Sequence, residues 1–240
     1  MSLLIHPQLP LGLEANERFN FDSFVAGDNA LAAGIVRQCA LGQGEQQIFL
    51  WSAPGLGKSH LLQACCQLAA RQQRAVCYLT AQQMLHQPVE MFEGLEQLQL
   101  ICLDDLEQWL SDASWQQALF NLINRIRESG HSLIMASATS PDASQIELPD
   151  LRSRLCWGPV FQLKPLADAD KYLAMKIRAR QSGLELPKNV ADYLLHRYPR
   201  DLNDLFERLA VLDKAAMSVK RPLTIPLIKT VFPENTKVSD

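Results

Sequence analysis

The chain has 240 residues, of which 48% are hydrophobic and 20% are charged, and its formal net charge at pH 7 is −3. These values are typical of a folded, soluble protein that is long enough to bury a substantial core. Proteins that grip duplex DNA usually carry a basic excess, so the acidic balance favours another protein as the main partner.

Residues 1–17 are predicted to form an extended tail, because two prolines and a glycine leave them without a helical period. Behind a glutamine, the tail has a leucine at every second residue, and this spacing places the leucines on one face of an extended peptide. Such a peptide suits an apolar pocket of a partner, and it equally suits a strand that packs on its own domain. The residues concerned are Gln8, Leu9, Leu11 and Leu13.

Three phenylalanines lie within residues 19–24, and Phe24 is followed by Val25. Aromatic side chains just ahead of a phosphate-binding domain can line a pocket for a nucleotide base, although packing into a core is the commoner fate of such a cluster. An alanine-rich helix is then predicted to run to about residue 41, with Asp28 or Asn29 as its N-cap.

The segment 48–62 predicts a buried strand, a tight glycine-rich loop and the start of a helix. In a P-loop, backbone N–H groups surround a phosphate, a lysine adds positive charge, and a serine hydroxyl contacts Mg²⁺. The positive end of the following helix favours the same anion. An ordinary glycine-rich turn is the alternative. The loop residues are Ser52, Pro54, Gly55, Leu56, Gly57, Lys58, Ser59 and His60.

The full P-loop pattern has glycine at the position of Ser52. A serine serves there if its backbone φ stays negative, because only a positive φ or a very close backbone approach requires glycine. The surrounding strand and helix favour nucleotide binding over a chance turn.

After a strand at 75–80 and short helical pieces at 81–93, an apolar strand at 98–105 ends in Asp104 and Asp105. Ligands of parallel sheets sit at the carboxyl ends of the strands. One carboxylate there can hold a water bound to Mg²⁺, and the next can orient an attacking water. The alternative is that the two aspartates cap the next helix.

A helix is predicted from about residue 114 to Ser129, and Gly130 ends it. The buried strand 132–137 follows and ends in Ser137. The Ser137 hydroxyl either faces a γ-phosphate or a water molecule, or caps the turn that follows.

Two arginines, Arg152 and Arg154, interrupt an otherwise apolar short helix at 151–158, where arginines are usually solvated or paired with acids. A last strand at 160–163 completes an alternation of strands and helices over residues 18–165. That alternation predicts an α/β domain with a parallel sheet flanked by helices.

From residue 166 to 232 the pattern changes to helices with no strand among them, which predicts a small all-helical second domain. Residues 233–240 are expected to fray. The expected helices lie near 168–182, 187–197, 201–217 and 224–231, with a turn marked by Gly183 and Pro187.

The six cysteines lie in apolar stretches without C-x-x-C spacing, so we expect buried, reduced thiols and a cytoplasmic protein. The five histidines are scattered, and none is at metal-ligand spacing. We find no signal peptide and no apolar run near the length of a membrane span, so no membrane contact is expected.

The order of these motifs resembles the AAA+ domain of the bacterial replication initiator DnaA, over about residues 18–232. The resemblance implies a P-loop that binds ADP or ATP with Mg²⁺, and a helical lid. It implies the following roles: phosphate binding for Gly55, Gly57, Lys58 and Ser59, Mg²⁺ binding for Ser59 and Asp104, the second acid for Asp105, the first sensor for Ser137, and the arginine finger, which a subunit inserts toward its neighbour's γ-phosphate, for Arg154.

The chain departs from the family where the second sensor arginine opens the third lid helix, because it has Asn203 there. Asparagine cannot neutralise a phosphate charge. Arg200, one turn earlier, is the substitute candidate, although a solvent-facing arginine is the simpler expectation. Together with Ser52, this departure predicts weak or absent hydrolysis and a long-lived ADP state.

The tail is similar to the sliding-clamp-binding motif Gln-Leu-x-Leu-x-Leu, and the chain ends where the initiator's helix-turn-helix domain would begin. The resemblance therefore implies a relative that binds the clamp, the β subunit of DNA polymerase III, and inactivates DnaA without sequence-specific DNA binding of its own. A homodimer is left open. The main alternative is a self-standing P-loop ATPase of the helicase-loader type. A small-molecule phosphotransferase and a DNA-binding initiator fragment are disfavoured.

Overall fold

The computed structural model describes residues 18–84, 87–144, 146–219 and 222–233. The tail with Gln8, Leu9, Leu11 and Leu13 lies outside this range, as does nearly all of the end that was expected to fray. The chain divides into two compact units between Lys164 and Pro165. Each unit is described by itself.

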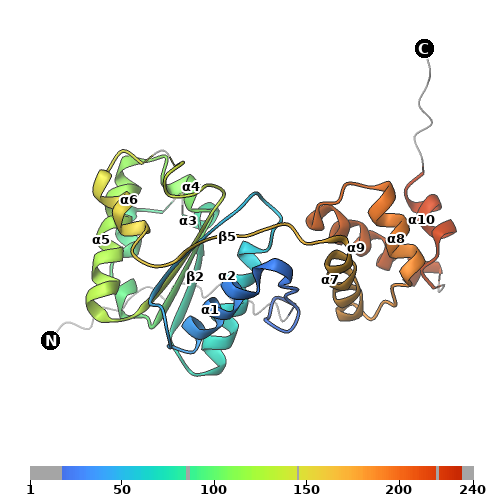
Figure 1. Ribbon diagram of the computed structural model, residues 1–240, viewed down its shortest axis with the longest axis horizontal. Helices are drawn as coiled ribbons and strands as arrows, with labels where there is room; N and C mark the ends of the chain where they lie inside the picture. The colour runs from blue at the N-terminus through green and yellow to red at the C-terminus, as the bar shows by residue number, and fades with distance from the viewer. Residues whose placement is uncertain (1–17, 85–86, 145, 220–221, 234–240) are drawn as a thin grey trace, which may run out of the picture. The chain divides into compact units, whose positions relative to one another are not determined.

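The first unit is built on a five-stranded sheet with the order β2-β3-β4-β1-β5, in which every pair of neighbours is parallel (Figure 1). The predicted parallel sheet is therefore confirmed. Its strands are continuous apolar runs because both faces are covered by helices. The strands are β1 (Gln47–Trp51), β2 (Val76–Thr80), β3 (Leu100–Asp104), β4 (Ser132–Ser137) and β5 (Val160–Gln162).

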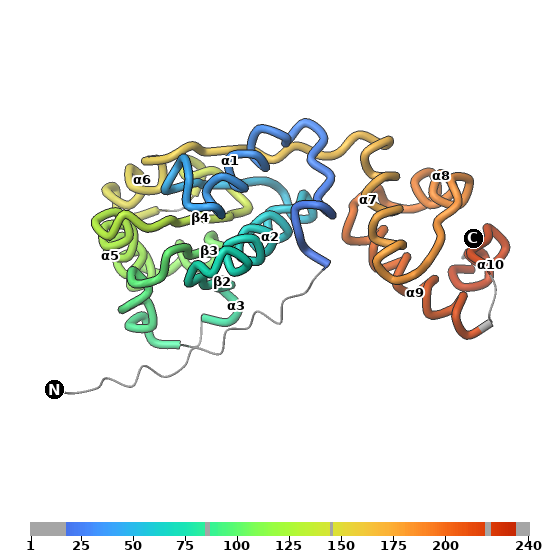
Figure 2. The backbone as a smooth tube through the Cα atoms, turned by 90° about the horizontal axis from the view of Figure 1, so that it is seen from below, coloured from blue at the N-terminus to red at the C-terminus, as the bar shows by residue number. Residues whose placement is uncertain are grey.

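Two helices cover one face of the sheet, and a group of helices covers the other (Figure 2). Side chains alternate along each strand, so in β1 Ile48 and Leu50 pack under the first pair whereas Phe49 packs under the second group. The pair consists of α1 (Ala30–Ala40) and α2 (Lys58–Arg71), and the group consists of α3 (Ala81–Met84), α4 (Leu106–Trp109), α5 (Ala113–Ser129) and α6 (Pro149–Leu155), with the 3-10 turns η2 (Val89–Phe92) and η3 (Leu95–Gln97).

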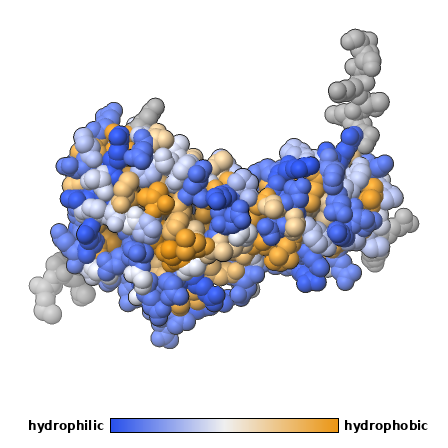
Figure 3. Space-filling model, viewed as in Figure 1, coloured by the Kyte–Doolittle hydropathy of each residue, from blue (hydrophilic) through white to orange (hydrophobic). Residues whose placement is uncertain are grey.

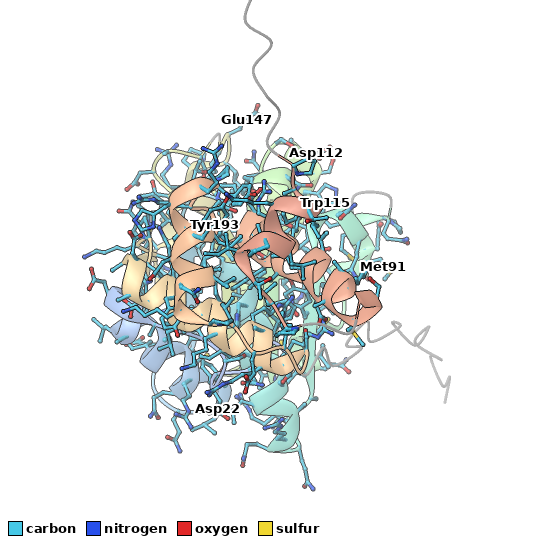
Figure 4. All side chains as sticks on the ribbon, turned by 90° about the vertical axis from the view of Figure 1, so that its right-hand side faces the viewer. Asp22, Met91, Asp112, Trp115, Glu147 and Tyr193 are labelled. Atoms are coloured by element: carbon cyan, nitrogen blue, oxygen red, sulfur yellow. The ribbon has the colours of Figure 1, made fainter. Side chains whose placement is uncertain are left out.

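The ends of α5 show why this helix begins and stops where it does. Asp112 accepts hydrogen bonds from the backbone N–H groups of Ser114 and Trp115, at 2.7 and 3.2 Å, and is therefore the N-cap (Figure 4). Gly130 ends the helix in the left-handed region, with a φ of 71°. The predicted stop at Gly130 is confirmed.

Asn29 occupies the N-cap position of α1, which is one of the two positions predicted for it. Asn29 precedes the helix and closes the 3-10 turn η1 (Gly27–Asn29), but its side chain makes no capping bond. The buried Asn29 amide instead accepts from the backbone N–H of Lys164 at 2.7 Å and donates to the Lys164 carbonyl at 2.9 Å. This side chain thus fixes the last residue of the first unit.

The second unit consists of four helices around one apolar core, and no strand occurs in its described residues. The turn predicted at Gly183 and Pro187 is confirmed, with Gly183 at a φ of 75° and Pro187 as the N-cap of the next helix. The helices are α7 (Asp168–Gln181), α8 (Lys188–Arg197), α9 (Leu202–Val219) and α10 (Ile225–Val231).

Apolar side chains gather over α1 and beside β5 on the face that Figure 3 shows. Among the described residues of the first unit, the exposed large hydrophobic side chains are Leu31 of α1, at 70%, and Val160 of β5, at 38%. Cysteine burial follows the prediction at five of six positions, but Cys156 is exposed at the end of α6. Within the described ranges, no helix has both the length and the apolarity to cross a membrane.

Candidate functional site

The glycine-rich loop joins β1 to α2, as predicted. Gly55 and Gly57 both have positive φ angles, 79° and 94°. A Cβ at Gly57 would lie 2.9 Å from Cε2 of Phe24, so both its conformation and its surroundings require glycine. Ser52 is buried and is not among the residues with a positive φ, so the serine fits its position.

Lys58, at the first position of α2, is only 8% exposed. Its ammonium donates to the backbone oxygen of Ser52 at 2.8 Å, to the Ser52 hydroxyl at 3.3 Å and to the Ala53 carbonyl at 3.3 Å. Burial lowers the pKa of Lys58, and nearby carboxylates oppose this effect. In the described part of the chain, no carboxylate lies within ion-pairing distance of this ammonium. A buried cation without an acidic partner fits a phosphate ligand.

Asp104 and Asp105 lie where β3 ends. Asp104 is buried; its Oδ2 accepts from the Tyr78 hydroxyl at 2.7 Å and its Oδ1 accepts from the Asp105 N–H at 3.0 Å. Burial, reinforced by the Asp104 carboxylate, raises the pKa of Tyr78, so this phenol stays a donor. Asp105 has a φ of 59° and occupies the N-cap position of α4, as the helix-cap alternative predicted, but its side chain makes no capping bond.

Ser137 ends β4, in register with Trp51 at the end of β1, and its carbonyl accepts from the Ser52 N–H at 3.2 Å. Its buried hydroxyl donates to Oε2 of Glu107 at 3.0 Å. The same oxygen accepts from the Ala138 N–H at 2.8 Å. The Ser137 hydroxyl also accepts from the Thr139 N–H at 3.3 Å, so it caps the following turn, as the alternative predicted, and it lies beside the phosphate loop as well.

Residues 19–25 lie against the loop and α2. Phe19 and Phe24 contact the His60 ring edge-on, with centroids 5.2 and 5.3 Å apart. His60 Nε2 lies 3.0 Å from the Asn20 carbonyl oxygen and 3.2 Å from the Ser23 hydroxyl. Phe24 also packs against the core under α1 and α2, and Leu56 of the loop does the same, whereas Pro54 is exposed and Val25 is half-buried.

Arg154 of α6 lies at the opposite end of β1 from the phosphate loop. Gln47, the first residue of β1, donates from Nε2 to the Arg154 carbonyl at 2.6 Å. The loop starts only after Trp51, about 13 Å farther along the strand at its usual rise per residue. The guanidinium of Arg154 therefore belongs to a surface remote from the chain's own loop.

The guanidinium of Arg154 stacks on the ring of Trp157, with 3.8 Å between its carbon and the ring centroid. Arg127 of α5 stacks on the same ring at 3.9 Å. Arg154 Nε is buried without a hydrogen-bond partner, and among the described residues neither arginine forms an ion pair with a carboxylate. Beyond Trp157 lies a hollow of about 310 Å³ lined by α5 and the start of β1. Cation–π contacts thus hold Arg154 without neutralising it.

Arg200 and Asn203, the two candidate nucleotide-binding residues of the lid, are both exposed. Arg200 pairs with Asp168 of its own unit, with 3.3 Å between Nη1 and Oδ2. Asn203 donates its backbone N–H to the Asp201 carboxylate at 2.9 Å at the start of α9.

The first unit thus brings together Lys58, Asp104, Asp105 and Ser137 from the prediction. It adds Tyr78 and Glu107, which the sequence analysis did not single out. Ser59 follows Lys58 on α2 and is exposed, so its hydroxyl and Asp104 remain the candidates for Mg²⁺. No cluster of three or more metal-binding side chains occurs in the residues described, and Mg²⁺ bound chiefly by phosphates and water needs none.

Residues 15–162 match the family model of the bacterial DnaA ATPase domain. The chain belongs to this family of AAA+ proteins. Residues 168–232 match a second family model, that of the Hda lid domain. The chain is therefore an Hda-type, DnaA-related protein, and the predicted AAA+ domain followed by a helical lid is confirmed.

Solved structures show the same fold. Domain III of the Thermotoga maritima initiator DnaA is similar at a TM-score of 0.80 and 20% identity, with 90% of this chain and 96% of that one covered. Aquifex aeolicus DnaA with bound AMPPCP is similar at a TM-score of 0.70 and 24% identity, with 86% of this chain and 68% of that one covered. The Thermotoga maritima RuvB Holliday junction branch migration motor is similar at a TM-score of 0.64 and 15% identity, with 85% of this chain and 67% of that one covered. At these identities the likeness concerns the fold alone.

Proposed function

We propose that this DnaA-related protein is a replication regulator that binds an adenine nucleotide, ADP in its resting state, and promotes hydrolysis of the ATP bound to DnaA. Arg154 is the finger that enters the partner's site. One observation carries this proposal: the arginine has no acidic partner among the described residues and is fixed at the end of β1 remote from its own phosphate loop.

Support for nucleotide binding comes from the loop itself. Gly57 has a positive φ, and a Cβ there would meet the Phe24 ring, so the loop keeps its shape only with glycine at this position. Lys58 is buried at the start of a 14-residue helix. Ser59 and Asp104 are proposed to share Mg²⁺ with the phosphates. A bound nucleotide supplies phosphate oxygens that the Lys58 ammonium can contact directly, which no carboxylate among the described residues does. The DnaA structure with AMPPCP supports an adenine nucleotide as the ligand.

ADP is the favoured state because Asn203 replaces the second sensor arginine and carries no charge. Arg200, which pairs with Asp168, remains the candidate substitute. Weak hydrolysis in the chain's own site separates this proposal from the alternative, a self-standing ATPase of the helicase-loader type.

The steady-state ATPase rate of the purified protein without partners decides between these two functions. We expect a rate far below about one per second, the slow end of typical enzyme turnover. Adding DnaA and clamp loaded on DNA is expected to produce ADP on DnaA. A rate of about one per second or more without partners would favour the helicase-loader alternative.

The tail is proposed to dock on the sliding clamp, and this confines the reaction to replicating DNA in the cytoplasm. Tethering raises the local concentration of the finger near DnaA. Whether the protein acts as a monomer or a homodimer does not affect this step, and no sequence-specific contact with DNA is required.

Changing Gln8 and Leu11 together to alanine is expected to weaken clamp binding at least about tenfold, because burying one leucine side chain is worth about 1.5–3 kcal/mol. Surface plasmon resonance on immobilised clamp measures the effect, and thermal unfolding checks that the fold is intact. A matched control changes Ser2 and Glu14 to alanine in the same tail. Clamp affinity equal to that of the wild type in the double variant would exclude this peptide as the docking motif.

A further inference from the structure

The carboxylate of Glu107 accepts a hydrogen bond from the hydroxyl of Ser137. The Oε2 atom of Glu107 accepts from Ser137 Oγ at 3.0 Å and from the Ala138 N–H at 2.8 Å. Ser137 is bonded through its carbonyl to the N–H of Ser52, the first residue of the phosphate loop. The carboxylate of Glu107 is therefore held at the base of that loop, and the Ser137 hydroxyl points its hydrogen at the carboxylate.

The turn at Asp105 places Glu107 there. Asp105 adopts the left-handed conformation, with a φ of 59° and a ψ of 43°, and α4 starts at the next residue. This turn redirects the chain from the end of β3, so that the second residue of α4 faces the end of the neighbouring strand β4. Asparagine and aspartate tolerate this conformation better than most residues.

Negative charge exceeds positive charge at this end of the loop. Asp104, Asp105 and Glu107 are the three carboxylates that act on the single ammonium of Lys58. The pKa of Asp105 is raised by burial, and the carboxylates of Asp104 and Glu107 raise it further. Apart from the Mg²⁺ proposed to accompany the phosphates, an additional anionic group in this region therefore meets two or three carboxylates and one cation.

We propose that Glu107 makes the site selective for nucleoside diphosphates over triphosphates. This inference rests on the proposed nucleotide site and on Ser137 as the side chain that meets a third phosphate group. A triphosphate has to take the Ser137 hydroxyl away from Glu107 and to lie near its negative charge. A diphosphate ends before that point and leaves the Glu107–Ser137 bond intact.

Two substitutions separate charge from hydrogen bonding. Glu107→Gln keeps a side-chain oxygen that accepts from Ser137 and from the Ala138 N–H, but removes the charge. Glu107→Ala removes both and frees the Ser137 hydroxyl. We expect both variants to bind ATP more tightly relative to ADP, with the glutamine variant changing the ratio about tenfold, which corresponds to about 1.4 kcal/mol.

The test is isothermal titration of nucleotide-free, full-length protein with ADP and with the non-hydrolysable triphosphate AMPPCP, at one fixed concentration of Mg²⁺. Glu128→Gln is the matched control, because Glu128 is exposed on α5 and its substitution changes the net charge by the same amount as Glu107→Gln. We expect its ratio to equal that of the wild type. Thermal unfolding of each variant checks the fold.

The outcomes separate a failure of the proposed nucleotide site from a failure of the selectivity assigned to Glu107. Wild-type protein that binds neither nucleotide would refute the proposed nucleotide site itself. Wild-type protein that binds both, with an unchanged ratio in Glu107→Gln and Glu107→Ala, would overturn the selectivity of Glu107 and leave the site standing. Equal loss of both affinities in a folded Glu107→Gln variant would also overturn it, because Glu107 would then only support the loop.

Discussion

Replacing Arg154 with alanine is expected to slow the hydrolysis of DnaA-bound ATP about 10³-fold or more, because an arginine supplied by a neighbouring molecule stabilises charge on the transferring phosphoryl group. Nucleotide binding should stay unchanged, since the guanidinium stacks on Trp157 at the end of β1 remote from the phosphate loop. Clamp binding should stay unchanged as well, because it is assigned to the tail. The measurement follows labelled ATP on DnaA as it becomes ADP, in the presence of clamp on DNA.

Arg152 provides the control for this variant. It lies two residues earlier on α6, carries the same charge and is exposed, so Arg152→Ala should retain nearly the full rate. Arg154→Lys retains the charge but not the planar fork of donors, and an intermediate rate is expected. An Arg154→Ala protein that inactivates DnaA as fast as the wild type would remove the finger from the mechanism.

Replacing Gly158 with alanine is expected to destabilise the fold by at least about 1–3 kcal/mol, because the added methyl group overpacks a fixed backbone. Its Cβ would lie 1.8 Å from the carbonyl oxygen of Gln47, so the segment behind α6 has to move away from β1. That displacement also shifts Trp157, which supports Arg154. Urea unfolding measures the stability loss, and the DnaA assay should show a slower rate even where the protein remains folded.

Gly34→Ala is the same chemical change at a position with open space. Gly34 is exposed inside α1, and a Cβ there meets no atom within 4 Å. Alanine is the better helix former by about 0.8–1 kcal/mol, so this variant should be more stable than the wild type. Similar unfolding midpoints for the two variants would show that Gly158 does not lie against Gln47 as described.

Elements whose signal is local were predictable from the sequence. The apolar runs of β1 and β4 need only their own residues to be recognised as buried strands, and Gly130 marks the end of α5 by its backbone freedom. The P-loop follows the same logic, since Gly55 and Gly57 are required by their own backbone angles.

Features that depend on distant parts of the chain were not predictable in this way. Asn29 lies at a predicted N-cap position, but the hydrogen bonds of its side chain go to Lys164, which is 135 residues away in sequence. Glu107 acquires its role only because β4 places Ser137 beside α4. Trp157 carries no signal of its own in the sequence, and only the packing of α5 against α6 brings Arg127 onto its ring.

The distribution of thiols gives this protein a natural attachment point for a spectroscopic probe. Burial raises the pKa of Cys39 and Cys77 to about 12, and it raises that of Cys102 as well, so these side chains resist alkylation. Cys156 alone among the six is exposed, and it lies two residues beyond Arg154. Partial burial and the Asp142 carboxylate raise the pKa of this thiol too, so its exposure is what makes it the accessible one. A fluorophore coupled to Cys156 under mildly alkaline conditions will lie close to Arg154, and its emission will report docking on DnaA in real time. The other cysteines need not be removed first, because they are buried.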